Sequence, residues 1–226
     1  MKKTPEQYFQ EQDFAVLEAD INAGHEFTLA EIAFMEKYLG IERSDLKQKN
    51  SPLASLKYDD TYIGNGQTLG PPEEPVEQVL KREENMLLVG FFIGNQEFTI
   101  PTVAVQEVIK AIPVSKMPIS PDFVHGVINL RGRITPLVHL GEMLEVSGYD
   151  KKKEGFVIVC RRRGLQFGLM IEKVHTMYRV AQGSIDWAVE AHIGASVEYI
   201  SGLLKINDML VSVVSIDKIV ERILAE

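Results

Sequence analysis

The chain has 226 residues, of which 45% are hydrophobic and 25% charged, and its formal net charge is −8. These proportions are ordinary for a globular protein, with room for one larger domain or two small ones. The acidic balance argues against nucleic-acid binding, which needs a basic surface. No run approaches the roughly 20 apolar residues of a membrane span, and no apolar stretch follows the first lysines as in a signal peptide. We therefore expect a cytoplasmic protein that does not insert into membranes.

Residues 1–40 are predicted to form a helical extension. One apolar stripe has helical spacing and ends before Gly24, and a second ends at Gly40. Thr28 and Glu31 have the spacing of a capping box ahead of the second stripe. The stripes are Phe14, Leu17 and Ile21, and then Leu29, Ile32, Met35 and Leu39.

Residues 41–85 are predicted to be a connector, because glycine, proline and asparagine are dense there; Val76 to Lys81 would form one further helical turn. Residues 1–85 hold 9 basic and 17 acidic residues, a net of −8, whereas residues 86–226 hold 15 of each. Two helices with one apolar stripe each are too small to be stable alone. The extension must dock on the chain's own β region or on a separate partner. We favour the former, since Arg161, Arg162 and Arg163 offer a basic counterpart.

From residue 86 onward, short apolar segments alternate with turn residues, as in a sandwich or barrel. The hairpins fall into two groups, 86–150 and 151–226, which indicates two similar small barrels. Ser215 to Leu224 is predicted to be a closing helix. The expected strands are 86–93, 97–100, 103–109, 123–130, 134–140, 156–160, 166–171, 199–205 and 209–214.

The residues that could carry chemistry do not assemble into a catalytic or metal site. The five histidines have neither helical i, i+4 spacing nor cysteine neighbours. Cys160, the only cysteine, lies in an apolar strand and reads as a small hydrophobe. The glycines of residues 64–70 lack the spacing of a phosphate-binding loop. We expect no enzyme activity, no metal and no cofactor. The Arg161–Gly164 run is either a solvated turn or a contact for an acidic partner or for the acidic extension.

Residues 123–138 form the segment best suited to protein recognition. Asn129 and Arg131 share the strand face opposite the core side, and Gly132 permits a tight reversal at the tip. Pro136 cannot donate to a ladder, so a free strand edge is expected nearby. The alternative is an ordinary charged hairpin.

The same segment, Phe123 to Gly132 and on to Val138, resembles the signature of CheW-like coupling proteins of bacterial chemotaxis. The segments 105–109, 168–174 and 199–202 also resemble the family, in order, and the resemblance covers residues 86–226. It implies a mainly β fold of two five-stranded barrels of the Src-homology-3 type, with a C-terminal helix after the helical N-terminal extension. The resemblance does not cover residues 1–85.

The resemblance implies a non-enzymatic adaptor that couples the cytoplasmic tip of a chemoreceptor to the regulatory domain of a CheA-type histidine kinase. His139 stands where the family usually has an acidic residue. The role of the family's carboxylate is therefore not assigned in this chain, and a pH-sensitive histidine could replace it. An alternative is an adaptor of a chemosensory pathway that does not control swimming, with the extension binding a separate partner. The resemblance implies that Val105, Glu107, Gly126 and Arg131 bind the receptor, and Gly126 would let a receptor helix approach the backbone. We add Asn129 and Gly132 of the same hairpin to the predicted receptor-binding residues.

Overall fold

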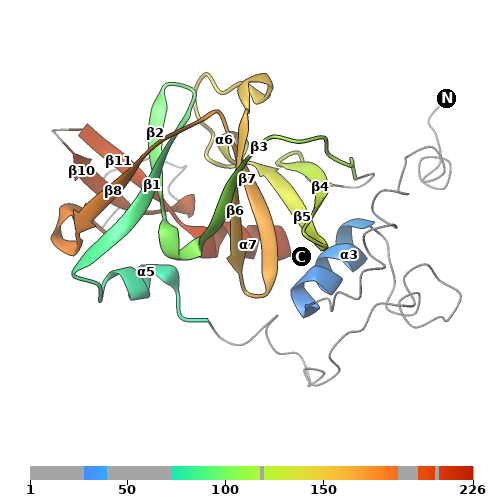
Figure 1. Ribbon diagram of the computed structural model, residues 1–226, viewed down its shortest axis with the longest axis horizontal. Coiled ribbons are helices and arrows are strands. Elements are labelled where there is room, and N and C mark those ends of the chain that lie inside the picture. Colours follow the sequence, from blue (N-terminus) through green and yellow to red (C-terminus); the bar gives the residue numbers. More distant parts are fainter. Residues whose placement is uncertain (1–27, 40–72, 118–119, 188–197, 207–208, 226) are drawn as a thin grey trace, which may run out of the picture.

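The computed structural model describes residues 28–39, 73–117, 120–187, 198–206 and 209–225 (Figure 1). The predicted first helix with Phe14, Leu17 and Ile21 lies outside the described residues, as does most of the 41–85 connector. The fold is mainly β, as predicted, with short helices on the outside of two sheets. Outside the sheets lie α3 (Leu29–Leu39), α5 (Val76–Leu80), α6 (Leu140–Met143), α7 (Ile216–Leu224) and the 3-10 turns η2 (Thr102–Ala104), η3 (Lys151–Lys153) and η4 (Gln182–Ser184).

The six-stranded sheet has the order β8-β1-β2-β11-β10-β9. Two hairpins form its centre, and the inner strands of these hairpins, β2 and β11, pair in parallel through Phe98 with Ser212 and Thr99 with Val213. The outer strands β8 and β9 lie next to β1 and β10. The bounds are β1 (Asn85–Ile93), β2 (Gln96–Pro101), β8 (Lys173–Ala181), β9 (Ile185–Asp186), β10 (Ile200–Ile206) and β11 (Met209–Val214).

The five-stranded sheet has the order β3-β6-β7-β5-β4 and the same plan. Its two hairpins, β4–β5 and β6–β7, meet where β5 and β7 pair in parallel. The end strands do not form a ladder with each other, but an isolated bridge joins Ser115, just after β3, to Val127 in β4. The bounds are β3 (Val105–Lys110), β4 (Val124–Leu130), β5 (Arg133–His139), β6 (Phe156–Arg162) and β7 (Leu165–Ile171).

Three details of the predicted barrels are wrong. One sheet has six strands rather than five, and in the described residues neither sheet closes by a continuous ladder. The sheets also do not divide the chain at residue 150. Strands β3 to β7 form one sheet, whereas β1 and β2 join β8 to β11 in the other. The reason is the parallel pairing of β2 with β11: it links strands more than 100 residues apart, and the rhythm of hairpins along the chain carries no sign of it.

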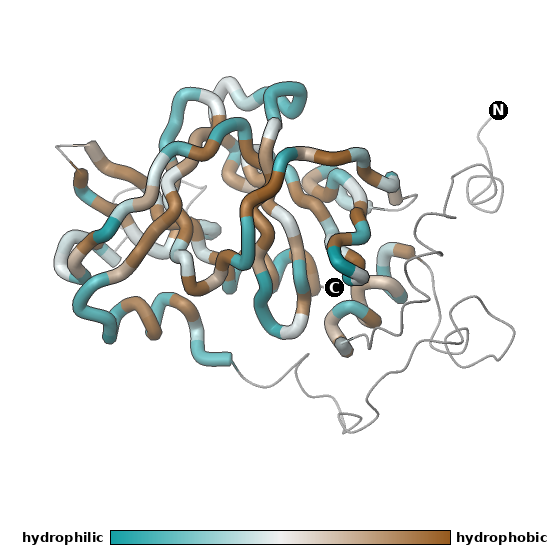
Figure 2. Tube along the Cα trace, viewed as in Figure 1, coloured by the Kyte–Doolittle hydropathy of each residue, from teal (hydrophilic) through white to brown (hydrophobic). Residues whose placement is uncertain are grey.

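The larger apolar core runs through both sheets and the helices that cover them, and a smaller one lies on the five-stranded sheet around Leu137, Val157 and Met170. Apolar residues follow the strands, whereas the β6–β7 turn and the connection between α6 and β6 are hydrophilic (Figure 2). The predicted closing helix is confirmed as α7. Ser215 caps it by accepting from the N–H of Lys218. The face of α7 that carries Ile216, Ile219, Val220 and Ile223 is buried.

The second predicted helix of the extension is confirmed as α3, and it packs on the chain's own β region. The capping box forms as predicted, because Glu31 Oε2 accepts from the N–H of Thr28 at 2.8 Å and Thr28 Oγ1 accepts from the N–H of Glu31 at 3.2 Å. Seven of its eleven residues are buried. Residues 73–85 also pack, with Val76 and Leu80 of α5 in the core. That part of the chain is therefore docked structure rather than connector.

Candidate functional site

The β4–β5 turn presents Arg131 at the tip of a hairpin. Leu130 pairs with Arg133, so the turn has two central residues. Arg131 and Gly132 both have positive φ, 56° and 80°, which is the backbone of a type I′ turn. The N–H of Gly132 donates to Asn129 Oδ1 at 2.9 Å. Of the predicted contact residues, Asn129 and Gly132 thus build the turn that carries Arg131.

Arg131 meets Glu107 across the open side of the five-stranded sheet. Its Nη2 lies 2.8 Å from Glu107 Oε2, although the two residues are 24 positions apart. Glu107 lies in the end strand β3, and Arg131 lies in the turn that follows the other end strand, β4. The Arg131 side chain is 77% exposed and that of Glu107 28%. An ion pair at this exposure contributes little to stability. It leaves four of the five guanidinium N–H donors of Arg131 for a partner. Val105, at the start of the same strand as Glu107, is half-buried.

Gly126 has a different role from the one predicted. We expected it to let a partner helix approach the backbone. The space beside its Cα is instead filled by the chain itself: a Cβ there would lie 2.4 Å from the carbonyl oxygen of Ser115 and 2.6 Å from Val114. Its φ of 151° also lies outside the range that side chains favour. Gly126 thus permits the Ser115–Val127 bridge between the two ends of the sheet.

An exposed apolar patch lies where the two sheets join, and the sequence patterns did not reveal it. Leu87, Val103 and Met177 are 37%, 65% and 59% exposed; we call these three residues the junction patch. Thr102 Oγ1 donates to the carbonyl of Leu87, which holds η2 beside β1. Met177 is paired with Val89, two positions from Leu87 on the same face. Since η2 leads directly into β3, the patch adjoins the strand that carries Glu107.

His139 is buried in a hydrogen-bonded chain rather than placed at the surface. Its Nδ1 lies 2.7 Å from Glu154 Oε2 and its Nε2 lies 3.1 Å from His125 Nδ1. The hydroxyl of Tyr149 donates to the other oxygen of Glu154. A carboxylate only accepts, so Nδ1 of His139 donates to Glu154, while its Nε2 shares a hydrogen bond with Nδ1 of His125. The position at which the resemblance implies an acidic residue therefore holds a histidine that has a carboxylate, Glu154, as its partner.

Burial lowers the pKa of His125 below its usual value, and the charge of His139 adds to this effect. Burial and the hydrogen bond to Glu154 raise the pKa of Tyr149 far above its usual range. The chain of four residues joins β4, the end of β5 and the connection between α6 and β6. Sequence reasoning missed it because Glu154 and Tyr149 lie in a connection with no regular pattern.

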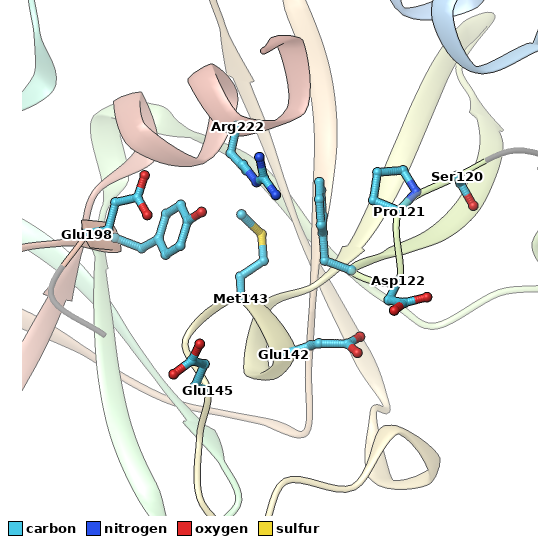
Figure 3. A pocket seen from close by; sticks show the side chains of 10 residues that line it. Ser120, Pro121, Asp122, Glu142, Met143, Glu145, Glu198 and Arg222 are labelled. Carbon is cyan, nitrogen blue, oxygen red and sulfur yellow. The ribbon is translucent and has the colours of Figure 1, made fainter. Parts of the chain in front are cut away.

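A cavity of about 620 Å³ opens between α6, α7 and the segment before β4 (Figure 3). The guanidinium of Arg222 lies 5.5 Å from the ring centre of Phe123, within the reach of a cation–π contact. The walls of the cavity also include Tyr199 and Met143, and four carboxylates stand at the rim of the cavity. Among the described residues, no group of three or more His, Cys, Asp or Glu side chains is arranged to hold a metal ion. The rim carboxylates are Asp122, Glu142, Glu145 and Glu198.

Comparison with known proteins places the chain in one family. The model of the CheW-like domain matches residues 87–224. The chemotaxis protein CheW of Thermotoga maritima is 32% identical over 137 residues, which cover 60% of this chain and 88% of that protein. The chemotaxis protein CheW of Helicobacter pylori is 29% identical over 140 residues, covering 62% and 84%.

A solved structure, the scaffolding protein TtCheW of Thermoanaerobacter tengcongensis, has the same fold, with a TM-score of 0.54 at 24% identity over 58% of this chain and 89% of that one. These matches confirm the resemblance seen in the sequence: the chain belongs to the CheW-like domain family and is related to chemotaxis proteins. No helix in the described part of the chain has the length and apolar character needed to cross a membrane.

Proposed function

We propose that this protein is a non-enzymatic adaptor that couples the cytoplasmic tip of a chemoreceptor to the regulatory domain of a CheA-type histidine kinase, within cytoplasmic receptor arrays. The observation that carries the proposal is the Glu107–Arg131 pair. It unites two positions that the family resemblance implies for receptor binding, at the exposed tip of a hairpin. The relatives named as chemotaxis proteins support the setting.

The receptor surface consists of the Arg131 tip and the neighbouring junction patch. An arginine beside apolar side chains suits a helical tip, because the guanidinium donates to carbonyls or amides while apolar residues of the helix cover Leu87, Val103 and Met177. Val108 and Ile112, 38% and 41% exposed, continue the apolar character along and beyond β3. We expect Arg131 to be a hot spot of this contact.

The kinase surface lies at the opposite end of the β1–β2 hairpin. Met209 and Leu210, at the start of β11, are 57% and 64% exposed. Since β11 runs parallel to β2 with Ser212 beside Phe98, Met209 is level with the β1–β2 turn. Leu87 lies seven residues earlier than that turn, roughly 20 Å away at about 3.3 Å per strand residue. Two separate surfaces allow an adaptor to hold both partners at once.

The experiment is reconstitution of a complex from the receptor tip and the kinase of the source organism. The protein should join both in one sedimenting assembly. Met209→Ser with Leu210→Ser should abolish kinase binding and leave receptor binding intact, and Arg131→Ala should do the reverse. A protein that joins neither partner refutes the proposed function, and loss of both partners in each variant refutes the separation of the two surfaces.

A further inference from the structure

The two hairpins of the five-stranded sheet are separated at the end that carries their turns. The parallel ladder between β5 and β7 covers only Leu137 to His139, paired with Gly168 to Met170. Closer to the turns, Gln166 bridges the hairpins through its Nε2, which donates to Thr135 Oγ1 at 2.7 Å. The sheet itself therefore supplies few bonds that fix the β4–β5 tip relative to the β6–β7 tip.

Helix α3 spans this gap with its first turn. Thr28 Oγ1 donates to the carbonyl of Gly164, in the β6–β7 turn, at 2.8 Å. Arg133 Nη1, next to the β4–β5 turn, donates to Glu31 Oε1 at 3.1 Å. Figure 1 shows α3 beside the ends of β4 and β5. The N-terminal turn of one helix thus holds both hairpin tips.

The contact with the β4–β5 hairpin is a buried ion pair. The Glu31 side chain is 0% exposed and that of Arg133 23% exposed. Removing one partner of such a pair leaves an uncompensated buried charge, so the pair resists separation. The far end of α3 is anchored independently, because the hydroxyl of Tyr38 donates to the carbonyl of Ile223 in α7 at 3.1 Å.

We propose that α3 is a brace that orients the receptor-binding hairpin, with Glu31 as its positioning residue. The inference rests on the proposed function, and it assigns residues 28–39 to the regulation of that same site. Arg131 is two residues from Arg133, within about 7 Å along the backbone. A tip held in one orientation binds more tightly, because less conformational freedom is lost on binding. The extension of this chain therefore tunes receptor affinity without touching the receptor.

Glu31→Gln in the full chain tests the brace, since glutamine also serves in a capping box and α3 keeps its start. Its affinity for the receptor tip should fall about fivefold to tenfold, the range expected when a positioning contact is lost. Arg133→Gln should give the same loss, and the double variant no more than either single one. The matched control is Tyr38→Phe, which weakens α3 at α7 and should leave receptor affinity unchanged.

Amide spectra without receptor separate this inference from the proposed function. Glu31→Gln should shift the resonances of Arg131 and Gly132, and Tyr38→Phe should not. If Glu31→Gln lowers the melting temperature but leaves both the tip resonances and the affinity unchanged, α3 is only a structural cover and the inference is wrong. If the unaltered protein fails to bind receptor, the proposed function is refuted, and the tip resonances alone then decide whether α3 braces the hairpin. Should Glu31→Gln fail to fold, Arg133→Lys, which keeps the charge but loses the fork geometry, takes its place.

Discussion

The two arginine–glycine turns of the five-stranded sheet have the same backbone and opposite surroundings. Arg131–Gly132 and Arg163–Gly164 both have positive φ at each position, 56° and 80° against 49° and 77°. Arg131 is mostly exposed and makes one ion pair. Beside the other turn, Arg162 is 11% exposed and pairs with both Glu73 and Asp217.

Arg163 completes the second turn, since its Nη2 pairs with Glu221 of α7 and its N–H donates to Glu73. At the turn with the greater concentration of charge in the sequence, Arg162 and Arg163 are thus paired by the chain itself. The turn with fewer charges is the one that remains open to a partner. Charge density alone therefore does not identify a binding site; what matters is whether the fold supplies counter-ions.

The largest expected effect is on stability, at the satisfied turn. Arg162→Met keeps most of the aliphatic stem and leaves the carboxylates of Glu73 and Asp217 without their shared partner. Breaking a mostly buried pair in this way should lower the free energy of unfolding by about 3 kcal/mol. Urea unfolding measures this, and receptor affinity of the folded fraction should not change. A loss below about 0.5 kcal/mol, typical of an exposed site, would mean that the turn is solvated.

Arg131→Ala should show the reverse pattern. Receptor binding should weaken by about 2 kcal/mol, the level of a hot spot, whereas the free energy of unfolding should change by less than about 0.5 kcal/mol. Calorimetric titration with a receptor tip and thermal unfolding check the two halves. A large fall in melting temperature at unchanged affinity would make Arg131 a structural residue like Arg162.

Gly132→Ala and Gly164→Ala compare the turns directly. Both glycines have φ near 80°, where alanine is strained, and neither substitution places a Cβ closer than 3.5 Å to another atom. Each should therefore cost about 1 kcal/mol or slightly more from backbone strain. Denaturant midpoints of the two variants should agree. A much larger loss at Gly164 would show that Thr28 of the extension packs more tightly there than the shared turn geometry implies.

The smallest expected effect is the pH dependence of the β4 region. The folded state lowers the pKa of His125 from the ordinary 6.5, so protonation favours the unfolded chain. The contribution of His125 to the free energy of unfolding should be fully present above about pH 6.5. It should be lost as the pH falls from there through the lowered pKa, and the loss should not increase at lower pH. His125→Asn should remove this part of the slope. Chemical denaturation between pH 5 and 8 measures it, and an identical slope in the variant would contradict the assignment.

The sequence predicted local structure well because local patterns determine it. The capping box at Thr28 and Glu31, the apolar face of α7 and the turn at Arg131–Gly132 all follow from residue types at fixed spacings. The parallel pairings of β2 with β11 and β5 with β7 did not follow, since they depend on contacts remote in sequence. The strand β8 was not predicted, because its exposure pattern does not alternate regularly.

The candidate site was predicted in part. Glu107 and Arg131 were named through a family resemblance, and the structure brings them together. The close approach expected at Gly126 is made by the chain's own backbone and not by a partner helix. The sequence does not distinguish these two cases, since both require a glycine. The junction patch was missed, since its three residues come from β1, η2 and β8 and become neighbours only when the sheets assemble.

The most direct test of the coupling function is co-sedimentation with receptor tips and kinase, with Arg131→Ala and Arg162→Met compared at a temperature where both variants are folded. The unaltered protein and Arg162→Met should join the assembly, and Arg131→Ala should remain largely in the supernatant. If Arg131→Ala sediments as fully as the unaltered protein, the open turn is not the receptor contact and the account is contradicted.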